Sequence, residues 1–177
     1  MKNLEKLQKE GVDAFRAGNF ELAEEKFLAL IDAATAENNP AKVAEAHNDL
    51  GVVRKQLGDI DGALIALDFA LDYYQSVDDA RGEAQVLGNF GMVEEAAGKI
   101  EDAIQSYLDS AAIFEELGDS EMAMYSWQAL SRLRLKNKDW INAIAAYEEG
   151  IAHLPDNSIK KKIVQTLLKT PGAFLGR

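Results

Sequence analysis

The chain repeats itself with a period of 40 residues, and this period restricts its possible folds more than any other feature. Residues 41–80 align with residues 81–120 without a gap. Seven positions are identical in the two blocks: Ala44/Ala84, Gly51/Gly91, Val53/Val93, Gly58/Gly98, Ile60/Ile100, Ala63/Ala103 and Asp79/Asp119. A fixed period of about 20 to 50 residues is typical of solenoids and propellers, whose units bury their apolar faces against neighbouring units.

The same step extends over residues 1–157. It gives columns of related residues, among them Phe20, Ile60, Ile100, Trp140; Ala23, Ala63, Ala103, Ala143; Phe27, Leu67, Tyr107, Tyr147; and Gly11, Gly51, Gly91, Ser131. The sequence therefore predicts four tandem units, at residues 1–40, 41–80, 81–120 and 121–157, with no domain boundary inside the array.

Each unit is predicted to contain two helices. In the first unit, a charged helix over about residues 2–17 precedes a second helix over about residues 21–37, where apolar residues recur at helical rather than strand spacing. This spacing argues against a propeller, which is built from strands. A left-handed residue, most often glycine, commonly ends a helix, and three units have glycine after the first helix: Gly18, Gly58 and Gly98. The fourth unit has Lys138 at this position.

Short polar stretches separate the predicted helices. Asn19, Asp59 and Asp139 are expected to cap the second helices, and the stops near residues 38–40, 78–80, 118–120 and 156–158 supply caps for the helices that follow. Pro40 suits the first position of a helix, where the missing N–H has no intrahelical partner. Residues 158–177 are expected to form a ninth, capping helix and a short tail, because apolar residues recur at helical spacing before Thr170-Pro171-Gly172.

The charge is unevenly distributed. The chain has 19 basic and 30 acidic residues, a net charge of -11, which disfavours nucleic acid as the main partner. Residues 158–177 contain five bases and no acid, so that residues 1–157 have a net charge of -16. The cluster Lys160-Lys161-Lys162 has three open explanations: the polar side of a cap, a contact with an anionic membrane, or a docking site for the acidic body of another copy. The cap is favoured, since lipid-binding clusters usually have four to eight bases, and no membrane partner is expected.

Several kinds of chemistry find no support in the sequence. The chain has no cysteine, which excludes disulfides and thiolate metal sites. It has no apolar run long enough to span a membrane and no signal-peptide pattern, so a soluble cytoplasmic protein is expected. His47 falls in a packing column and His153 at a helix end, which favours structural roles over metal binding or catalysis. We expect no catalytic residue, no cofactor and no metal site, and thus a protein that is not an enzyme.

The unit pattern resembles the tetratricopeptide repeat over about 155 residues. That family places a small residue in the first helix, glycine after it, alanine early in the second helix and an aromatic or large apolar residue four positions later. The corresponding residues here are Gly51, Gly58, Ala63 and Leu67 in one unit, Gly91, Gly98, Ala103 and Tyr107 in the next, and Trp127, Leu130, Ala143, Tyr147 and Pro155 in the last. The 40-residue unit is longer than the common one of 34 residues. It is similar to the longer units of the Pins/LGN adaptors, kinesin light chains and Rap regulators.

This resemblance implies an all-α, right-handed α-solenoid of four helix pairs with a C-terminal cap, whose first helices line a concave groove for a segment of another protein. Side chains one turn away from the packing columns would face this groove. Many of them are amides, which offer a donor and an acceptor to an extended peptide. The predicted partner-binding residues are Asn48, Val52, Gln85, Asn89, Met92, Tyr125, Gln128 and Arg132. A solvated helix face has a similar composition, so that explanation also stays open.

Related proteins hold the C-terminal carboxylate of Hsp70 or Hsp90 with a clamp of lysines and asparagines. The matching positions here are Gln8, Val12, Asp49, Gln85 and Asn89, of which only Asn89 resembles the clamp. That ligand is not expected. The sequence thus predicts a scaffold or adaptor that binds a peptide or helix of a partner protein. The alternative is a self-assembling structural protein, a homo-oligomer in which the basic tail of one copy binds the acidic body of the next.

Overall fold

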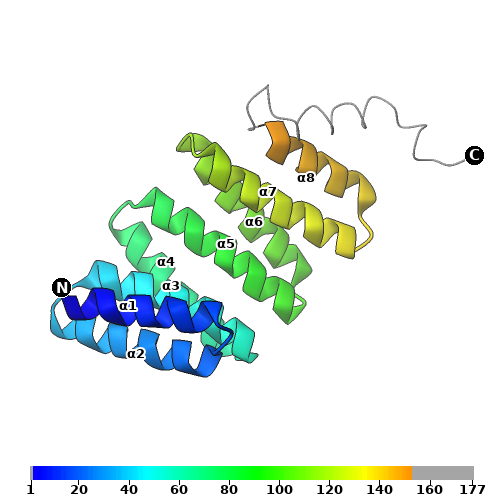
Figure 1. Cartoon of the computed structure of the whole chain (residues 1–177). Coiled ribbons are helices and arrows are strands. Elements are labelled where there is room, and N and C mark those ends of the chain that lie inside the picture. The colour runs from blue at the N-terminus through cyan, green and yellow to red at the C-terminus, as the bar shows by residue number, and fades with distance from the viewer. Residues whose placement is uncertain (1, 153–177) are drawn as a thin grey trace, which may run out of the picture. The chain divides into compact units, whose positions relative to one another are not determined.

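The computed structural model describes residues 2–152 and contains eight helices and no strand in that range (Figure 1). The helices are α1 (Lys2–Arg16), α2 (Phe20–Ala36), α3 (Pro40–Leu57), α4 (Ile60–Ser76), α5 (Ala80–Ala97), α6 (Ile100–Glu116), α7 (Ser120–Lys136) and α8 (Trp140–Ala152). The all-α class and the helix-pair pattern are therefore confirmed. The predicted capping helix, His153 and Pro155 lie outside the described residues.

The chain divides into two compact units, and the division falls inside α6. Residues 1–106 are called the first unit and residues 107–177 the second unit; each is larger than one 40-residue repeat. In the first unit each helix from α1 to α4 packs against the next one along the chain, and α3 also contacts α5. In the second unit α7 packs against α8. The right-handed course of the array and the four tandem repeat units stay predictions.

The turns between helices have the backbone that the sequence predicts. Gly18, Gly58 and Gly98 have φ values of +76°, +83° and +75°, in the left-handed region. Lys138 adopts the same conformation with φ of +63° although it carries a side chain, so the fourth turn keeps the geometry at a cost in backbone strain. Pro40 begins α3 as predicted.

Asparagine and aspartate cap the helices. The side chains of Asn19 and Asp59 accept hydrogen bonds from the backbone N–H groups of Leu22 and Gly62 at 3.2 and 3.0 Å. Asn39, Asp79 and Asp119 cap α3, α5 and α7 in the same way. At the start of α8 the side chain of Asn142 donates to the carboxylate of Asp139 at 3.0 and 2.9 Å, and the capping role of Asp139 stays a prediction.

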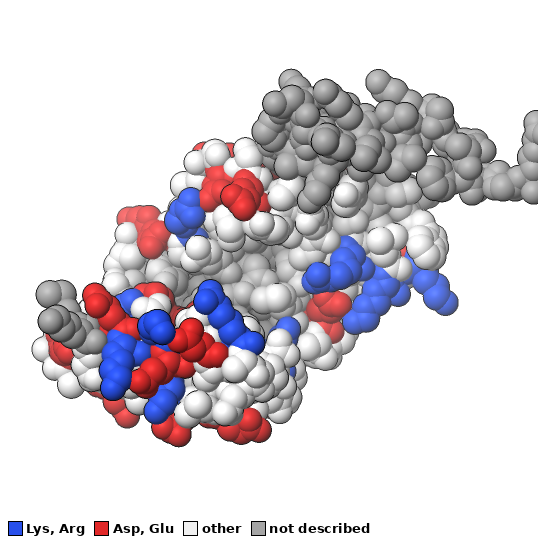
Figure 2. Space-filling view, in the orientation of Figure 1, with Lys and Arg blue, Asp and Glu red and all other residues white. Residues whose placement is uncertain are grey.

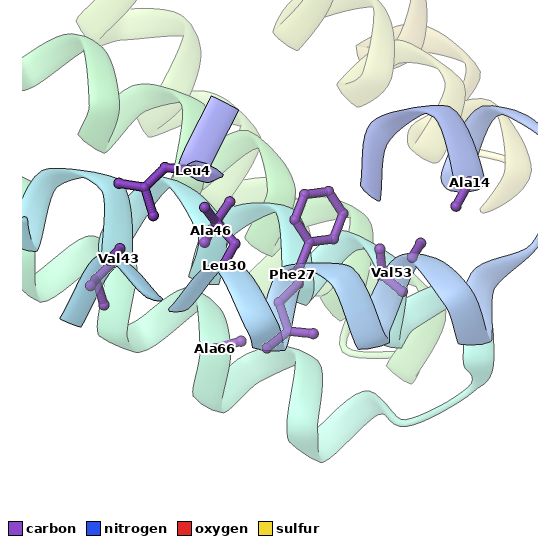
Figure 3. Packing of buried hydrophobic residues seen from close by; sticks show 11 residues of the cluster. Leu4, Ala14, Phe27, Leu30, Val43, Ala46, Val53 and Ala66 are labelled. Atoms are coloured by element: carbon purple, nitrogen blue, oxygen red, sulfur yellow. The ribbon is translucent and has the colours of Figure 1, made fainter. Parts of the chain in front are cut away.

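The core of the first unit combines small and large apolar residues from both helices of each pair. Figure 3 shows part of this core, with Phe27 between Leu30 and Val53. A Cβ atom added to Gly51 would lie 2.7 Å from two side-chain carbons of Leu67 and 3.2 Å from the carbonyl oxygen of Ala63. Glycine therefore lets the two helices approach closely.

Serine replaces glycine at the same position of the fourth pair. Ser131 is buried, and its Oγ donates a hydrogen bond of 2.8 Å to the carbonyl oxygen of Ala143. Ala143 is the counterpart of Ala63, whose carbonyl lies closest to Gly51 among the backbone atoms. The Ser131 hydroxyl thus forms a hydrogen bond with the carbonyl group whose counterpart in the second helix pair lies near Gly51. This hydrogen bond satisfies the buried hydroxyl, which explains why serine is tolerated in this column.

Candidate functional site

The first helices of the first unit, α1, α3 and α5, share a polar face that includes several predicted site residues. We call this surface the first-helix face. Its central contact is a hydrogen bond of 2.7 Å from Asn89 Nδ2 on α5 to Asn48 Oδ1 on α3. Both side chains are half-buried, and this is the only hydrogen bond of either side chain in the described part of the chain. Asn48 Nδ2 and Asn89 Oδ1 thus keep free donor and acceptor capacity.

A second polar network joins α1 to α3 on the same face. Gln8 Nε2 donates to Glu45 Oε1, and Lys42 Nζ donates to Gln8 Oε1 at 2.9 Å and to Glu45 Oε2. Lys42 and Glu45 therefore largely neutralise each other. This network fixes the polar side chains of the two helices relative to each other, which preorganises the face.

Asp49 is a functional candidate that the sequence interpretation left out of its site residues. Asp49 lines a pocket of about 200 Å³ formed by α1, α2 and α3, together with Val12, Phe15, Arg16, Phe27, Val52 and Val53. Burial, and to a lesser extent the charge of Glu45, raise the pKa of Asp49 to about 7, while Lys42 acts in the opposite direction. Asp49 occupies the same repeat column as Asn89, which was predicted to face the groove. An acidic residue in this column was the sequence signal that could have identified Asp49 as a candidate.

The remaining predicted residues of the first unit differ in exposure. Val52 is half-buried in the wall of the Asp49 pocket, Met92 is half-buried on α5, and Gln85 is exposed. A solvent-facing amide and two accessible apolar side chains thus lie on the helices that carry Asn48 and Asn89.

In the second unit, the predicted residues lie on α7. Gln128 and Arg132 line a pocket of about 360 Å³ with Ser131, Leu135 and Tyr147 of α8. Tyr125 is 51% exposed, and its hydroxyl donates a hydrogen bond of 3.2 Å to Glu121. Figure 2 shows basic side chains gathered around the C-terminal end of α7, where Arg134 and Lys136 lie in the last turn, whereas acids and bases alternate over α1 and α2.

His47 lies at the edge of the first unit's core. Its ring stacks on Phe69 of α4, with 4.2 Å between the ring centroids. Burial and the nearby Arg54 lower the pKa of His47, so the imidazole is neutral near pH 7. No group of three or more metal-ligating side chains occurs among residues 2–152.

A larger hollow lies away from the predicted residues, between the α2–α3 turn and α4. It has a volume of about 720 Å³ and is lined by Thr35, Asn38, Asn39, Pro40, Val43, Phe69, Asp72, Tyr73 and Ser76. Phe69 is 51% exposed and Ile65, one turn before it, is 67% exposed. The sequence reasoning missed this surface because it treated the second helices as packing elements.

Comparison with known proteins identifies the repeat. Residues 42–116 match the family model described as "Tetratricopeptide repeat". The prediction of tetratricopeptide repeats from Gly51, Gly58, Ala63 and their counterparts is therefore confirmed for residues 42–116. No curated protein sequence matches the chain, and the resemblance to the longer units of particular subfamilies stays a prediction.

A solved structure has the same fold. The crystal structure of BtubC (BKLC) from P. vanneervenii superposes with a TM-score of 0.74 at 18% sequence identity, covering 94% of this chain and 64% of that chain. At this identity the likeness concerns the arrangement of helices alone. The chain spans about 64% of the length of BtubC. No helix within residues 2–152 is long and apolar enough to cross a membrane.

Proposed function

We propose that this protein is a non-catalytic scaffold or adaptor that binds an extended or helical segment of a partner protein on its first-helix face. Tetratricopeptide repeats in general mediate protein–protein interaction. The observation that carries the proposal for this chain is the Asn48–Asn89 pair, which connects two successive first helices and presents an unused donor and an unused acceptor. Such a pair recognises a peptide backbone irrespective of the side chains of the peptide.

The site that we propose includes the eight residues predicted from the sequence, extended by Asp49. Gln128 and Arg132, on α7 of the second unit, would offer an amide and a cation to a partner protein. The location that we propose is the cytoplasm, as the sequence suggests.

Affinity capture tests this proposal. The bait is the full chain, and the comparison is the triple variant Asn48→Ala, Asn89→Ala and Arg132→Glu, after thermal melts establish that both proteins are folded. We expect a defined partner to be retained by the wild type and lost by the variant. A control variant, Ile65→Ala on the exposed side of α4, should retain it. Equal retention by wild type and triple variant would refute the proposal.

A second candidate function is self-assembly, which the charge distribution favours. Residues 158–177 contain Lys160, Lys161, Lys162, Lys169 and Arg177 without an acid, whereas residues 1–157 have a net charge of -16. Opposite charges of this size attract at low ionic strength. Light scattering of the full chain and of residues 1–157 tests it: an oligomer that dissociates on truncation and in high salt supports assembly, and a monomer in both cases refutes it.

A further inference from the structure

The Asp49 pocket contains a carboxyl group that forms no hydrogen bond or ion pair with another side chain within residues 2–152. Lys42, the nearby base on the same helix, donates its hydrogen bonds to Gln8 and Glu45. Arg16 lines the pocket from the end of α1, but no ion pair joins it to Asp49 among the described residues. Partial burial makes ionisation of this carboxyl unfavourable, and a ligand that supplies a positive donor offsets this effect.

The rest of the pocket is apolar. Phe27 and Val53, which are 2% and 1% exposed, form its floor. Val12, Phe15 and Val52 are half-buried and form its walls. A volume of about 200 Å³ admits one long side chain. Apolar walls with a single carboxyl match a side chain that has a methylene stem and a charged end.

We propose that this pocket binds a lysine side chain of the partner segment, with Asp49 accepting the hydrogen bond of the ammonium group and with Val12 and Val52 against the methylene stem. This inference rests on the proposed function and adds a specificity to it: the Asn48–Asn89 pair holds the backbone of the partner, and Asp49 selects a residue. Lysine fits better than arginine, because a single carboxyl matches a compact point charge, whereas the planar guanidinium favours two parallel acceptors.

The proposal has a pH signature. The charged groups around Asp49 are Arg16 on α1 and Lys42 and Glu45 on α3. Tyr74 on α4 is a neutral titratable neighbour, whose pKa is raised mainly by burial and in part by the charge of Asp49. Lysine binding requires the ionised carboxylate. Since burial raises the pKa of Asp49 to about 7, lysine binding strengthens as the pH rises from 5.5 to 8.

The probe is a set of three immobilised nonapeptide pools with mixed flanking residues and a fixed central lysine, norleucine or glutamate. Norleucine keeps the stem and lacks the ammonium group. The wild type is compared with Asp49→Asn and with the control Asp32→Asn, which changes an exposed aspartate on α2. We expect the wild type and the control to prefer the lysine pool over the norleucine pool by about tenfold at pH 8, the preference to shrink at pH 5.5, and Asp49→Asn to lose it.

Equal retention of the lysine and norleucine pools by the wild type would overturn the inference, as would the same lysine preference in Asp49→Asn. The pH dependence of the lysine preference is measured on the wild type alone. The inference therefore stays testable even if Asp49→Asn does not fold. If the partner capture above depends on Asn48 and Asn89 while the lysine preference is absent, only the Asp49 inference fails. If the wild type captures no partner, the proposed function fails.

Discussion

Replacing Asp49 by asparagine should stabilise the folded protein at neutral and alkaline pH but not at acidic pH. Burial among Val12, Val52 and Phe27 makes ionisation of the Asp49 carboxyl unfavourable in the folded chain. The pKa of Asp49 is therefore higher in the folded than in the unfolded state. The folded protein binds the proton more tightly, so the free energy of unfolding falls as the pH rises from about 4 to about 7 and is level above that range.

The size of this effect follows from the pKa difference. Asp49 shifts from 3.8 to about 7, and one pKa unit corresponds to about 1.4 kcal/mol, which gives an upper bound of about 4 kcal/mol. Water that enters the pocket reduces the effect, so we expect about 2 to 4 kcal/mol. Asparagine has a shape similar to that of aspartate and does not titrate. The Asp49→Asn variant therefore does not lose this part of the free energy of unfolding as the pH rises.

Urea unfolding of both proteins at pH 4, 5, 6, 7 and 8 measures the effect. The quantity of interest is the difference in unfolding free energy between Asp49→Asn and wild type, because other carboxyl groups contribute equally to both. This difference should grow in favour of the variant up to pH 7 and then stay constant. The control Asp32→Asn, at an exposed position on α2, should show no such growth. Parallel pH profiles of Asp49→Asn and wild type would refute the reasoning.

Two further predictions concern the helix pairs. Gly51→Ala should lower the free energy of unfolding by about 1 to 2 kcal/mol, because the new Cβ would lie 2.7 Å from Leu67 and this clash outweighs the better helix propensity of alanine; an unchanged or higher urea midpoint would contradict this. Lys138→Gly should raise the melting temperature, with a gain of about 0.5 to 1 kcal/mol, because glycine adopts the φ of +63° without strain; a lower melting temperature would show that the Lys138 side chain makes a stabilising contact.

Much of the fold could be predicted from the sequence because local rules determine it. The second helices begin at Phe20, Ile60, Ile100 and Trp140, at the same 40-residue step as the sequence columns. Gly18, Gly58 and Gly98 have the left-handed backbone expected of them. The helix starts and the left-handed glycines each depend on a few neighbouring residues, so the repeat pattern of the sequence was sufficient to predict them.

The site was less predictable, because it depends on how side chains from different helices meet. The columns placed Asn48 and Asn89 on related faces, but not the hydrogen bond between them. The pocket at Asp49 arises from helix spacing, which no local pattern encodes. The stacking of His47 on Phe69 likewise depends on how α3 packs on α4. The hydrogen bond from Asn142 Nδ2 to the carboxylate of Asp139 was not predicted either.

Site-specific photo-crosslinking tests the central claim most directly. A photoreactive amino acid replaces Gln85, which is exposed on α5, in one protein and Ile65, which is 67% exposed on α4, in another. Both proteins are irradiated in a lysate of the organism that encodes the chain, and the crosslinked peptides are identified by mass spectrometry. The account predicts a partner segment attached at position 85 and not at position 65. The same segment attached only at position 65 would place the partner on the second helices and contradict the account.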